Sequence, residues 1–297
     1  MSSAGTDADL VRALKERAGA NDSLVYAHRV YAETAALARR HGLAAPRAAL
    51  EIGPGVNLGS LFCFAASGVP ALSAVDVAPL PAAPPLFYET LREYLLATEG
   101  FSWWRAWADS ASAVASFPSL EAFPSAAALL GRIDLRSGVS SEALPFEDER
   151  FDLVYSVAAL EHVPDPGGTA AEMRRVLAPG GLAIHEIDLK HHGAADPLKF
   201  LEWDDGEWRK RATLYGGDLS LSEILGGSFG GEIFCNRLRR DDWLAVFRGA
   251  GFSVEAAEPV VLLEEARVRP DRLAEPFRGR PVEELRVLSL RVVARRV

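Results

Sequence analysis

The residues best suited to chemistry follow a short apolar run that predicts a buried strand at 182–187. They are Asp188, His191 and His192. A strand buried on both faces has little room for polar groups, so titratable side chains at its end call for a functional reason. Imidazole titrates near neutrality and a carboxylate accepts protons, which makes the three residues candidates for a general base, its orienting partner or substrate contacts. The structural alternative is that they are loop residues satisfied by local hydrogen bonds.

A metal ion would be a second use for the same residues. Asp188 with His191 or His192 would offer oxygen and nitrogen ligands and would suit an acceptor with a vicinal diol. Neighbouring side chains in an extended chain point in opposite directions, however, so adjacent histidines rarely reach the same ion. We therefore expect no metal here.

A glycine-rich turn follows another apolar run, at 47–52. Its sequence is Glu51-Ile-Gly53-Pro-Gly55-Val-Asn-Leu-Gly59. Glycines after a buried strand let the backbone approach a ligand, and the N-terminus of the helix predicted at 58–67 attracts anions. The dinucleotide fingerprint G-x-G-x-x-G would need glycine where Leu58 stands. The carboxylate of Glu51 favours the cationic amino-acid moiety of S-adenosylmethionine over a pyrophosphate, which it would repel. A purely structural turn is the alternative.

An acid ends the next predicted strand, at 71–76. This residue is Asp76. A carboxylate at that place can accept hydrogen bonds from both hydroxyls of a ribose. A turn or N-cap aspartate is the simpler interpretation. The joint occurrence of Glu51, the glycines and Asp76 favours a cofactor site.

These residues and three later segments resemble the class I S-adenosylmethionine-dependent methyltransferases. Ser141-Glu-Ala-Leu-Pro-Phe146 resembles the family's A-E-x-L-P-F element. Phe151-Asp-Leu-Val-Tyr-Ser-Val-Ala-Ala-Leu-Glu-His162 resembles its F-D-x-V-x-S-x-x-x-L-E-H element, and Arg174-Arg-Val-Leu-Ala-Pro-Gly-Gly181 its R-x-L-x-P-G-G element. The likeness covers residues 48–187 and is weaker beyond them. It is specific for fold and cofactor and says nothing about the methyl acceptor.

The resemblance implies a role for each matched residue. The residues expected at the cofactor are Glu51, Ile52, Gly53 and Gly55 at the methionine end, Asp76 and Val77 at the ribose, Ser140, Ser141 and Glu142 beside the adenine, and Ser156 and Val157 along the methionine and sulfonium. Ser140 stands where the family often has an aspartate that accepts from the adenine amino group; a serine hydroxyl or a backbone carbonyl could substitute. In such families a histidine at the position of His162 is usually helix-capping or cofactor-shaping.

The order of the predicted elements gives the fold class. Strands are predicted at 47–52, 71–76, 132–138, 151–156, 182–187, 252–255 and 285–294, and helices at 7–41, 58–67, 170–177 and 241–250. This alternation predicts an α/β fold with a doubly wound, mostly parallel, seven-stranded Rossmann-like sheet and helical insertions. The last strand alternates in character and should be antiparallel.

The domain organisation follows from two regions that are too long for simple connections. We expect an N-terminal helical cap over residues 1–45 and a methyltransferase domain over 46–297. Insertions at about 80–131 and 190–237 should form the acceptor pocket or a lid, because they combine bulky aromatic anchors with, in the second, glycine hinges. Core packing is the alternative for each of these aromatic side chains.

Composition and charge make some classes of binding partner less favourable for this protein. The 297 residues carry a net charge of −9, which disfavours nucleic-acid binding. No run of about 18 apolar residues predicts a membrane span, and the N-terminus lacks the features of a secretory signal, so we expect a cytoplasmic protein. Cys63 and Cys235 are too few for a disulfide framework or a structural zinc site. The best candidates for a basic patch are Arg237, Arg239 and Arg240, for which a solvated helix terminus is the simpler interpretation.

The leading functional hypothesis is an S-adenosylmethionine-dependent methyltransferase for a small molecule. O-methylation of a hydroxylated metabolite, sugar or natural-product intermediate is favoured, because the insertions suit a shaped pocket. A homodimer is left open. The alternatives are an N- or C-methyltransferase, or a catalytically inactive methyltransferase-like interaction module, which would predict damaged cofactor motifs. An NAD-binding oxidoreductase is disfavoured by the glycine spacing.

Overall fold

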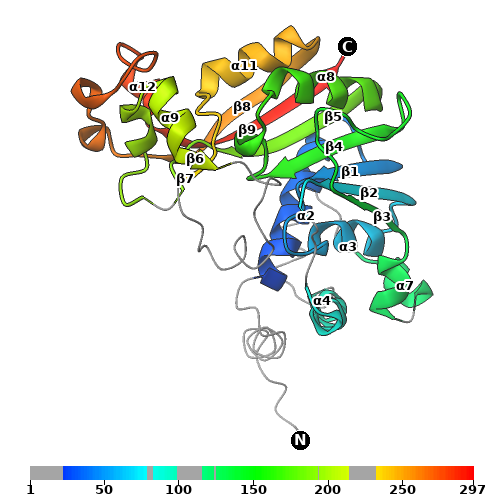
Figure 1. Cartoon of the computed structure of the whole chain (residues 1–297). Coiled ribbons are helices and arrows are strands. Elements are labelled where there is room, and N and C mark those ends of the chain that lie inside the picture. The colour runs from blue at the N-terminus through cyan, green and yellow to red at the C-terminus, as the bar shows by residue number, and fades with distance from the viewer. Residues whose placement is uncertain (1–22, 79–82, 99–115, 124, 193, 214–231) are drawn as a thin grey trace, which may run out of the picture. The chain divides into compact units, whose positions relative to one another are not determined.

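The computed structural model describes residues 23–78, 83–98, 116–123, 125–192, 194–213 and 232–297 (Figure 1). The chain divides into two compact units. The first comprises Met1–Ala74 and Leu80–Arg136, and the second comprises Val75–Pro79 and Ser137–Val297. Among the described residues, no helix is long and apolar enough to cross a membrane.

The main sheet has seven strands in the order β3-β2-β1-β4-β5-β9-β8. Strand β9 runs antiparallel to both β5 and β8, whereas β4 and β5 are parallel. The predicted fold class, a doubly wound and mostly parallel sheet with an antiparallel last strand, is therefore confirmed. The strands are β1 (Ala48–Ile52), β2 (Ala71–Asp76), β3 (Ile133–Ser137), β4 (Phe151–Val157), β5 (Leu177–Asp188), β8 (Phe252–Leu262) and β9 (Val287–Arg296).

The described part of the first unit also contains five helices. They are α2 (Ser23–Arg40), α3 (Gly59–Ala66), α4 (Pro85–Thr98), α6 (Ser119–Ala122) and α7 (Ala126–Leu130). Helix α3 packs closely on α2, because a β-carbon at Gly59 would lie 2.5 Å from the β-carbon of Ala27. Edge-on contact between Tyr31 and Phe64, with ring centroids 4.8 Å apart, extends this packing. The third glycine of the glycine-rich turn therefore serves the approach of two helices.

Helix α8 (Pro166–Val176) links β4 to β5 in the second unit. It begins four residues earlier than predicted, because Asp165 caps it by accepting a hydrogen bond from the Gly168 backbone and Pro166 occupies its first position. Strand β5 also begins earlier than predicted, at Leu177, which pairs with Phe151 before the register shifts. Pro179, Gly180 and Gly181 thus lie within the first part of the strand.

The regions that follow β5 and β8 share a small core of their own within the second unit. One region contains η2 (Lys199–Glu202), α9 (Asp205–Arg211) and the short parallel pair β6 (Ala212–Thr213) and β7 (Glu232–Ile233); the other contains η3 (Glu265–Arg267), η4 (Pro270–Arg272) and α12 (Val282–Leu285). We call this the small core; its members are Leu198, Phe200, Leu201, Trp208, Cys235, Leu263, Val268, Leu273, Phe277, Leu285 and Leu288. The described aromatic residues of the second predicted insertion thus include core residues. The glycines expected as hinges, at 216–231, lie outside the described residues.

A buried arginine joins the small core to the sheet. Arg239 precedes helix α11 (Arg240–Gly249) and is fully buried, and its guanidinium donates to the backbone carbonyls of Leu189, Leu285 and Val287. Burial lowers its pKa to about 10, so it remains charged at neutral pH. The interpretation of this segment as a solvated basic patch is wrong for Arg237 and Arg239, because both are buried and donate to backbone carbonyls.

The burial of Arg239 generates a prediction about stability. Arg239→Met should lower the free energy of unfolding by about 3 kcal/mol or more, because three buried carbonyls lose their charged donor. Arg240→Met is the matched control: the Arg240 side chain is exposed and pairs with Asp241 on the surface, so its loss should cost about 0.5 kcal/mol or less. Urea unfolding followed by tryptophan fluorescence measures both. Equal losses in the two variants would contradict this role for Arg239.

A second prediction concerns the pairing of β4 with β5. His185 is fully buried opposite Ser156 in the register, with its Nδ1 2.8 Å from the Ser156 hydroxyl, and burial lowers its pKa to about 3. The unfolded chain takes up a proton near pH 6.5 and the native ring does not. The free energy of unfolding should therefore fall, relative to a His185→Asn variant, by up to about 1.4 kcal/mol per pH unit between roughly pH 6 and pH 4. Parallel pH profiles for the two proteins would contradict the neutral, buried ring.

Candidate functional site

The glycine-rich turn of the first unit has the backbone conformation that its sequence predicts. Gly53 and Gly55 have φ of +68° and +67°, in the left-handed region where an L side chain is strained. A β-carbon at Gly55 would meet no atom within 4 Å, so the backbone at this residue borders open space. The turn therefore offers an approachable main chain directly after β1, as a ligand-binding turn requires.

The carboxylate of Glu51 is buried at the end of β1 and is held from helix α3. Its Oε2 accepts a hydrogen bond of 2.7 Å from the hydroxyl of Ser60. Ser60 is a positioning residue that the sequence pattern did not single out. Tyr88 of α4 is another: its hydroxyl accepts from the Leu58 backbone N–H at 3.0 Å, at the start of α3.

Asp76 lies in the second unit, where β2 ends, and its carboxylate is buried. One oxygen, Oδ1, accepts from the backbone N–H of Ala78 at 2.9 Å, which is the turn geometry that the simpler interpretation expected. The carbonyl of Asp76 accepts from the Val139 backbone N–H at 3.0 Å, so the chain just before Ser140 runs beside this carboxylate. Val77 is exposed next to it. The hydrogen bond of the turn uses Oδ1 of this carboxylate.

The other residues expected at the cofactor also lie in the second unit, each with a local partner. Ser140 is exposed and accepts from the Glu142 backbone N–H, while Glu142 itself accepts from the backbone N–H of Asp165. Ser141 is buried and bonds to the hydroxyl of Thr169 at 3.0 Å. The Ser156 hydroxyl is occupied by His185, so only the Ser156 backbone is left for a ligand.

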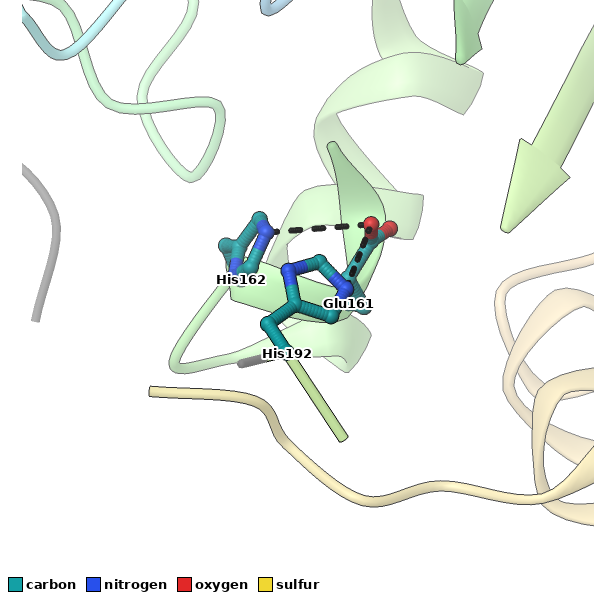
Figure 2. A group of neighbouring side chains, drawn as sticks. All are labelled: Glu161, His162 and His192. Carbon is teal, nitrogen blue, oxygen red and sulfur yellow. Dashed lines mark ion pairs between the residues drawn. The ribbon is translucent and has the colours of Figure 1, made fainter. Parts of the chain in front are cut away.

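A second group of side chains gathers where β4 and β5 end. The parallel pairing continues past β4, where the Ala158 backbone N–H donates to the carbonyl of Glu186 at 2.9 Å. The short helix η1 (Leu160–His162) follows β4. Asp188 is the last residue of β5, and residues 189–192 follow it. We call Glu161, His162, Asp188 and His192 the carboxylate–imidazole cluster. Figure 2 shows three of its members, with both imidazoles facing the same oxygen of the Glu161 carboxylate.

Glu161 is the most buried member of the cluster, with 2% of its surface exposed. Its Oε2 lies 3.4 Å from the backbone nitrogen of Asp188, which donates to it. Its Oε1 has no hydrogen-bond partner among the described residues and faces Nε2 of His162 at 3.7 Å and Nε2 of His192 at 4.0 Å. Burial, and next the negative charge of Asp188, raises the pKa of Glu161 to about 8. The apolar surroundings thus favour a neutral carboxyl unless a cation compensates its charge.

Asp188 differs from Glu161 although the two side chains are neighbours. Its Oδ2 lies 2.9 Å from the ammonium of Lys190 and 3.5 Å from Nε2 of His192. Burial alone would raise its pKa, but together these partners hold it below the usual value. Asp188 is therefore an ionised, partly exposed carboxylate beside a protonatable acid.

His162 is oriented by the main chain. Its Nδ1 lies 2.7 Å from the carbonyl of Phe234, and a carbonyl can only accept, so Nδ1 carries the proton. Burial lowers the pKa of this imidazole to about 4, which leaves it neutral at pH 7. The lone pair of the neutral ring is then on Nε2, the nitrogen that faces Glu161.

The two adjacent histidines after β5 diverge, as strand geometry predicts. His192 joins the cluster, whereas His191 is buried in the opposite direction, stacked on Phe200 of the small core, with Nε2 3.0 Å from a carboxylate oxygen of Glu232. Of the three residues expected to be catalytic, the structure brings Asp188 and His192 together and places His191 elsewhere. Glu161, which sequence reasoning left without a role in the chemistry, lies at the centre of the cluster; its signal was an acid next to a histidine directly after a buried strand.

The cluster has the groups needed for proton transfer and for ion binding. Asp188 can accept a proton, and Glu161, His162 and His192 place one ligand atom each within 4.8 Å of one another. Both uses suit the carboxyl ends of parallel strands, where open α/β sheets hold their ligands.

Comparisons with known proteins agree with the motifs and the fold. A family model described as a methyltransferase domain matches residues 109–185. An uncharacterized methyltransferase of Mycobacterium marinum is 42% identical over 65 residues, which are 18% of this chain and 26% of that protein; one from Mycobacterium tuberculosis is 36% identical over 77 residues, 22% of this chain and 30% of that protein. The chain thus covers about a quarter of the length of these relatives.

A solved structure, a S-adenosylmethionine dependent methyltransferase from Mesorhizobium loti, is similar at 16% identity and a TM-score of 0.40, covering 84% of this chain and 90% of that one. Residues 109–185 of the chain thus match a methyltransferase domain. The order of the strands and the glycine turn after β1 agree with the resemblance of the sequence motifs to the class I S-adenosylmethionine-dependent methyltransferases.

Proposed function

We propose that the protein transfers a methyl group from S-adenosylmethionine to a hydroxyl group of a small molecule. The observation that supports this most strongly is the ionised Asp188 beside the buried Glu161 and His192, at the ends of β4 and β5. A sulfonium activates its methyl group for in-line displacement, and a hydroxyl acceptor must also lose its proton. The carboxylate of Asp188 is the group that takes that proton.

The residues that would hold the cofactor fit its chemistry. We assign Gly53 and the open backbone at Gly55, with Ile52 and the carboxylate of Glu51, to the methionine end of S-adenosylmethionine. Glu51 supplies the negative charge that a cationic amino-acid group needs and a phosphate would not tolerate. The other assignments follow the family: Asp76 and Val77 at the ribose, Ser140, Ser141 and Glu142 at the adenine, and the backbone of Ser156 and Val157 along the methionine and sulfonium.

A hydroxyl acceptor is favoured over a carbon acceptor by the charge state of the cluster. Asp188 stays ionised because Lys190 and His192 hold its charge, so it can accept a proton at neutral pH. His192 orients this carboxylate. The long segments around the small core would shape the pocket for a small acceptor. Together they support O-methylation of a hydroxylated metabolite, sugar or natural-product intermediate.

The role of Asp76 can be tested by titration calorimetry. Asp76→Ala should weaken the binding of S-adenosylmethionine by about 1–3 kcal/mol, because the ribose loses its hydrogen-bond acceptor. Asp76→Asn keeps an oxygen for the Ala78 backbone N–H and so separates loss of the turn from loss of the charge. Asp241→Ala, on the surface of α11, should leave the affinity unchanged.

Unchanged affinity in Asp76→Ala would remove this residue from the site. Wild-type protein that titrates with NAD and not with S-adenosylmethionine would overturn the proposed function as a whole.

The role of Asp188 requires an acceptor, which a metabolite screen with isotope-labelled S-adenosylmethionine identifies by mass spectrometry. Asp188→Asn should then lower kcat by roughly 10²–10⁴-fold, because the amide cannot take the acceptor proton. Its affinity for S-adenosylmethionine should stay close to that of the wild type. The kcat of the variant should recover in part at high pH, where the acceptor hydroxyl ionises unaided. A variant with wild-type kcat would exclude Asp188 as the proton acceptor.

A further inference from the structure

The carboxylate–imidazole cluster has the donor set and spacing of a metal site. We propose that Glu161, His162 and His192 bind one divalent transition-metal ion of the zinc, cobalt and iron(II) class, at the ends of β4 and β5. The binding itself is independent of the proposed function; only the role of the ion in methyl transfer rests on it.

The first argument is the distance between the donor atoms. Oε1 of Glu161 lies 3.7 Å from Nε2 of His162 and 4.0 Å from Nε2 of His192, and all three atoms lie within 4.8 Å of one another. A tetrahedral ion with bonds of about 2.0–2.1 Å needs ligand atoms about 3.3 Å apart. Side-chain shifts of less than roughly 1 Å would therefore close the site, and Figure 2 shows both rings on the same side of the Glu161 oxygen.

The second argument is the partner of the first histidine. The Phe234 carbonyl accepts from Nδ1 of His162 at 2.7 Å, on the side of the ring away from the cluster. A metal-binding histidine usually donates its other N–H to a carbonyl or carboxylate, which fixes the tautomer and raises the basicity of the ligating nitrogen. His162 thus has the outer contact that a ligand needs.

The third argument is the state of Glu161. Oε1 is buried, and no described residue donates a hydrogen bond to it. A buried polar atom without a partner is costly, whereas an ion between this oxygen and the two imidazoles would satisfy it. The other oxygen is already fixed by the Asp188 backbone N–H, so the carboxylate is held in the orientation that points Oε1 at the rings.

The charges around the cluster also favour a cation. Asp188 is ionised beside the ammonium of Lys190, 2.9 Å away, so these two charges balance. With a cation bound, Glu161 would contribute a further negative charge. Asp188 Oδ2 lies 3.5 Å from Nε2 of His192, close enough to orient a bound water or acceptor oxygen.

The type of ligand selects the type of metal. Two imidazoles and a carboxylate suit zinc, iron(II), cobalt or nickel, whereas magnesium and calcium prefer oxygen ligands alone. Three protein ligands leave an open position, the arrangement of a catalytic ion rather than a structural one. If the proposed function holds, that open position takes the acceptor oxygen and lowers the pKa of its hydroxyl, and Asp188 receives the proton.

Metal titration of the chelator-treated full chain tests the inference. Cobalt(II) serves as a spectroscopic probe, because tetrahedral nitrogen and oxygen ligands give it an intense visible absorption, and zinc(II) then displaces it; calorimetry with magnesium(II) gives the oxygen-ligand comparison. We expect one ion per chain and no measurable magnesium binding. Glu161→Gln, His162→Gln and His192→Gln should each weaken cobalt binding on the order of 100-fold or more.

Two variants serve as controls. His191→Gln removes the neighbouring histidine that points into the small core, and His41→Gln removes a histidine of the first unit; both should bind cobalt as the wild type does. Circular dichroism confirms that each variant is folded, and a variant that is not folded is replaced by the corresponding alanine variant. Absence of stoichiometric cobalt binding in wild-type protein, or full affinity in all three cluster variants, would overturn the metal site.

The same samples separate this inference from the proposed function. Calorimetry with S-adenosylmethionine on the metal-free protein reports the cofactor site alone. Cofactor binding without metal binding would overturn only the metal site. Metal binding that the cluster variants abolish, in a protein that does not bind S-adenosylmethionine, would uphold the metal site and overturn the proposed function.

Discussion

The parallel pairing of β4 with β5 is the constraint on which the chemistry of this protein depends. The register sets Val157 opposite Glu186, and the Ala158 backbone N–H extends the pairing by donating to the Glu186 carbonyl. Both strands therefore end at the same level, so segments about 30 positions apart in the sequence meet there. One brings the buried Glu161 and the other the partly exposed Asp188, and the burial of Glu161 makes a charge there expensive unless another charge balances it.

The two carboxyl groups of the cluster ionise differently because different groups surround them. Glu161 is held by one backbone N–H and faces rings, so burial raises its pKa, whereas Asp188 has an ammonium and an imidazole and stays ionised. Neighbouring carboxyl groups whose pKa values are pushed apart are typical of sites that move protons. A bound cation would reverse the balance at Glu161 by stabilising its charged form, while Asp188 would remain available to the acceptor. The proton acceptor and the proposed metal ligand are thus different residues, and the two roles are compatible.

Much of the fold could be predicted from local patterns, because each strand of the parallel part is an apolar run next to a glycine or a polar break. The strand at 71–76 has the predicted bounds, and the positive φ of Gly53 and Gly55 follows from their places after β1. The small core could not be predicted, because its members come from two segments about 60 residues apart that carry no periodic pattern. Arg239 is a similar case: charge alone suggested a solvated residue, and only the three carbonyls around it explain its burial. The helical cap at 1–45 and the lid stay predictions, since residues 1–22 and 214–231 lie outside the described residues.

The candidate site, like the fold, could be predicted only in part from local sequence. Alternation along an extended chain predicts that His191 and His192 point apart, and they do. Which of the two would meet Glu161 depends on the small core, because that core decides which side of the chain is apolar. His191 stacks on Phe200 there, and its backbone N–H donates to the Pro197 carbonyl at 2.7 Å, which leaves His192 facing the cluster.

Two hydrogen bonds of the Leu189 backbone therefore hold the chain where it leaves β5. The Leu189 backbone N–H donates to the Leu288 carbonyl at 2.8 Å, and the Leu189 carbonyl accepts from Arg239. Both contacts belong to segments that carry none of the reacting groups, yet they set the path of the chain between Asp188 and His192. A loss of packing in the small core should consequently change the geometry of the cluster, because these contacts fix the backbone between Asp188 and His192. The small core is in this sense part of the site: it stabilises the one backbone path on which a carboxylate and an imidazole from the end of β5 reach the buried acid at the end of β4.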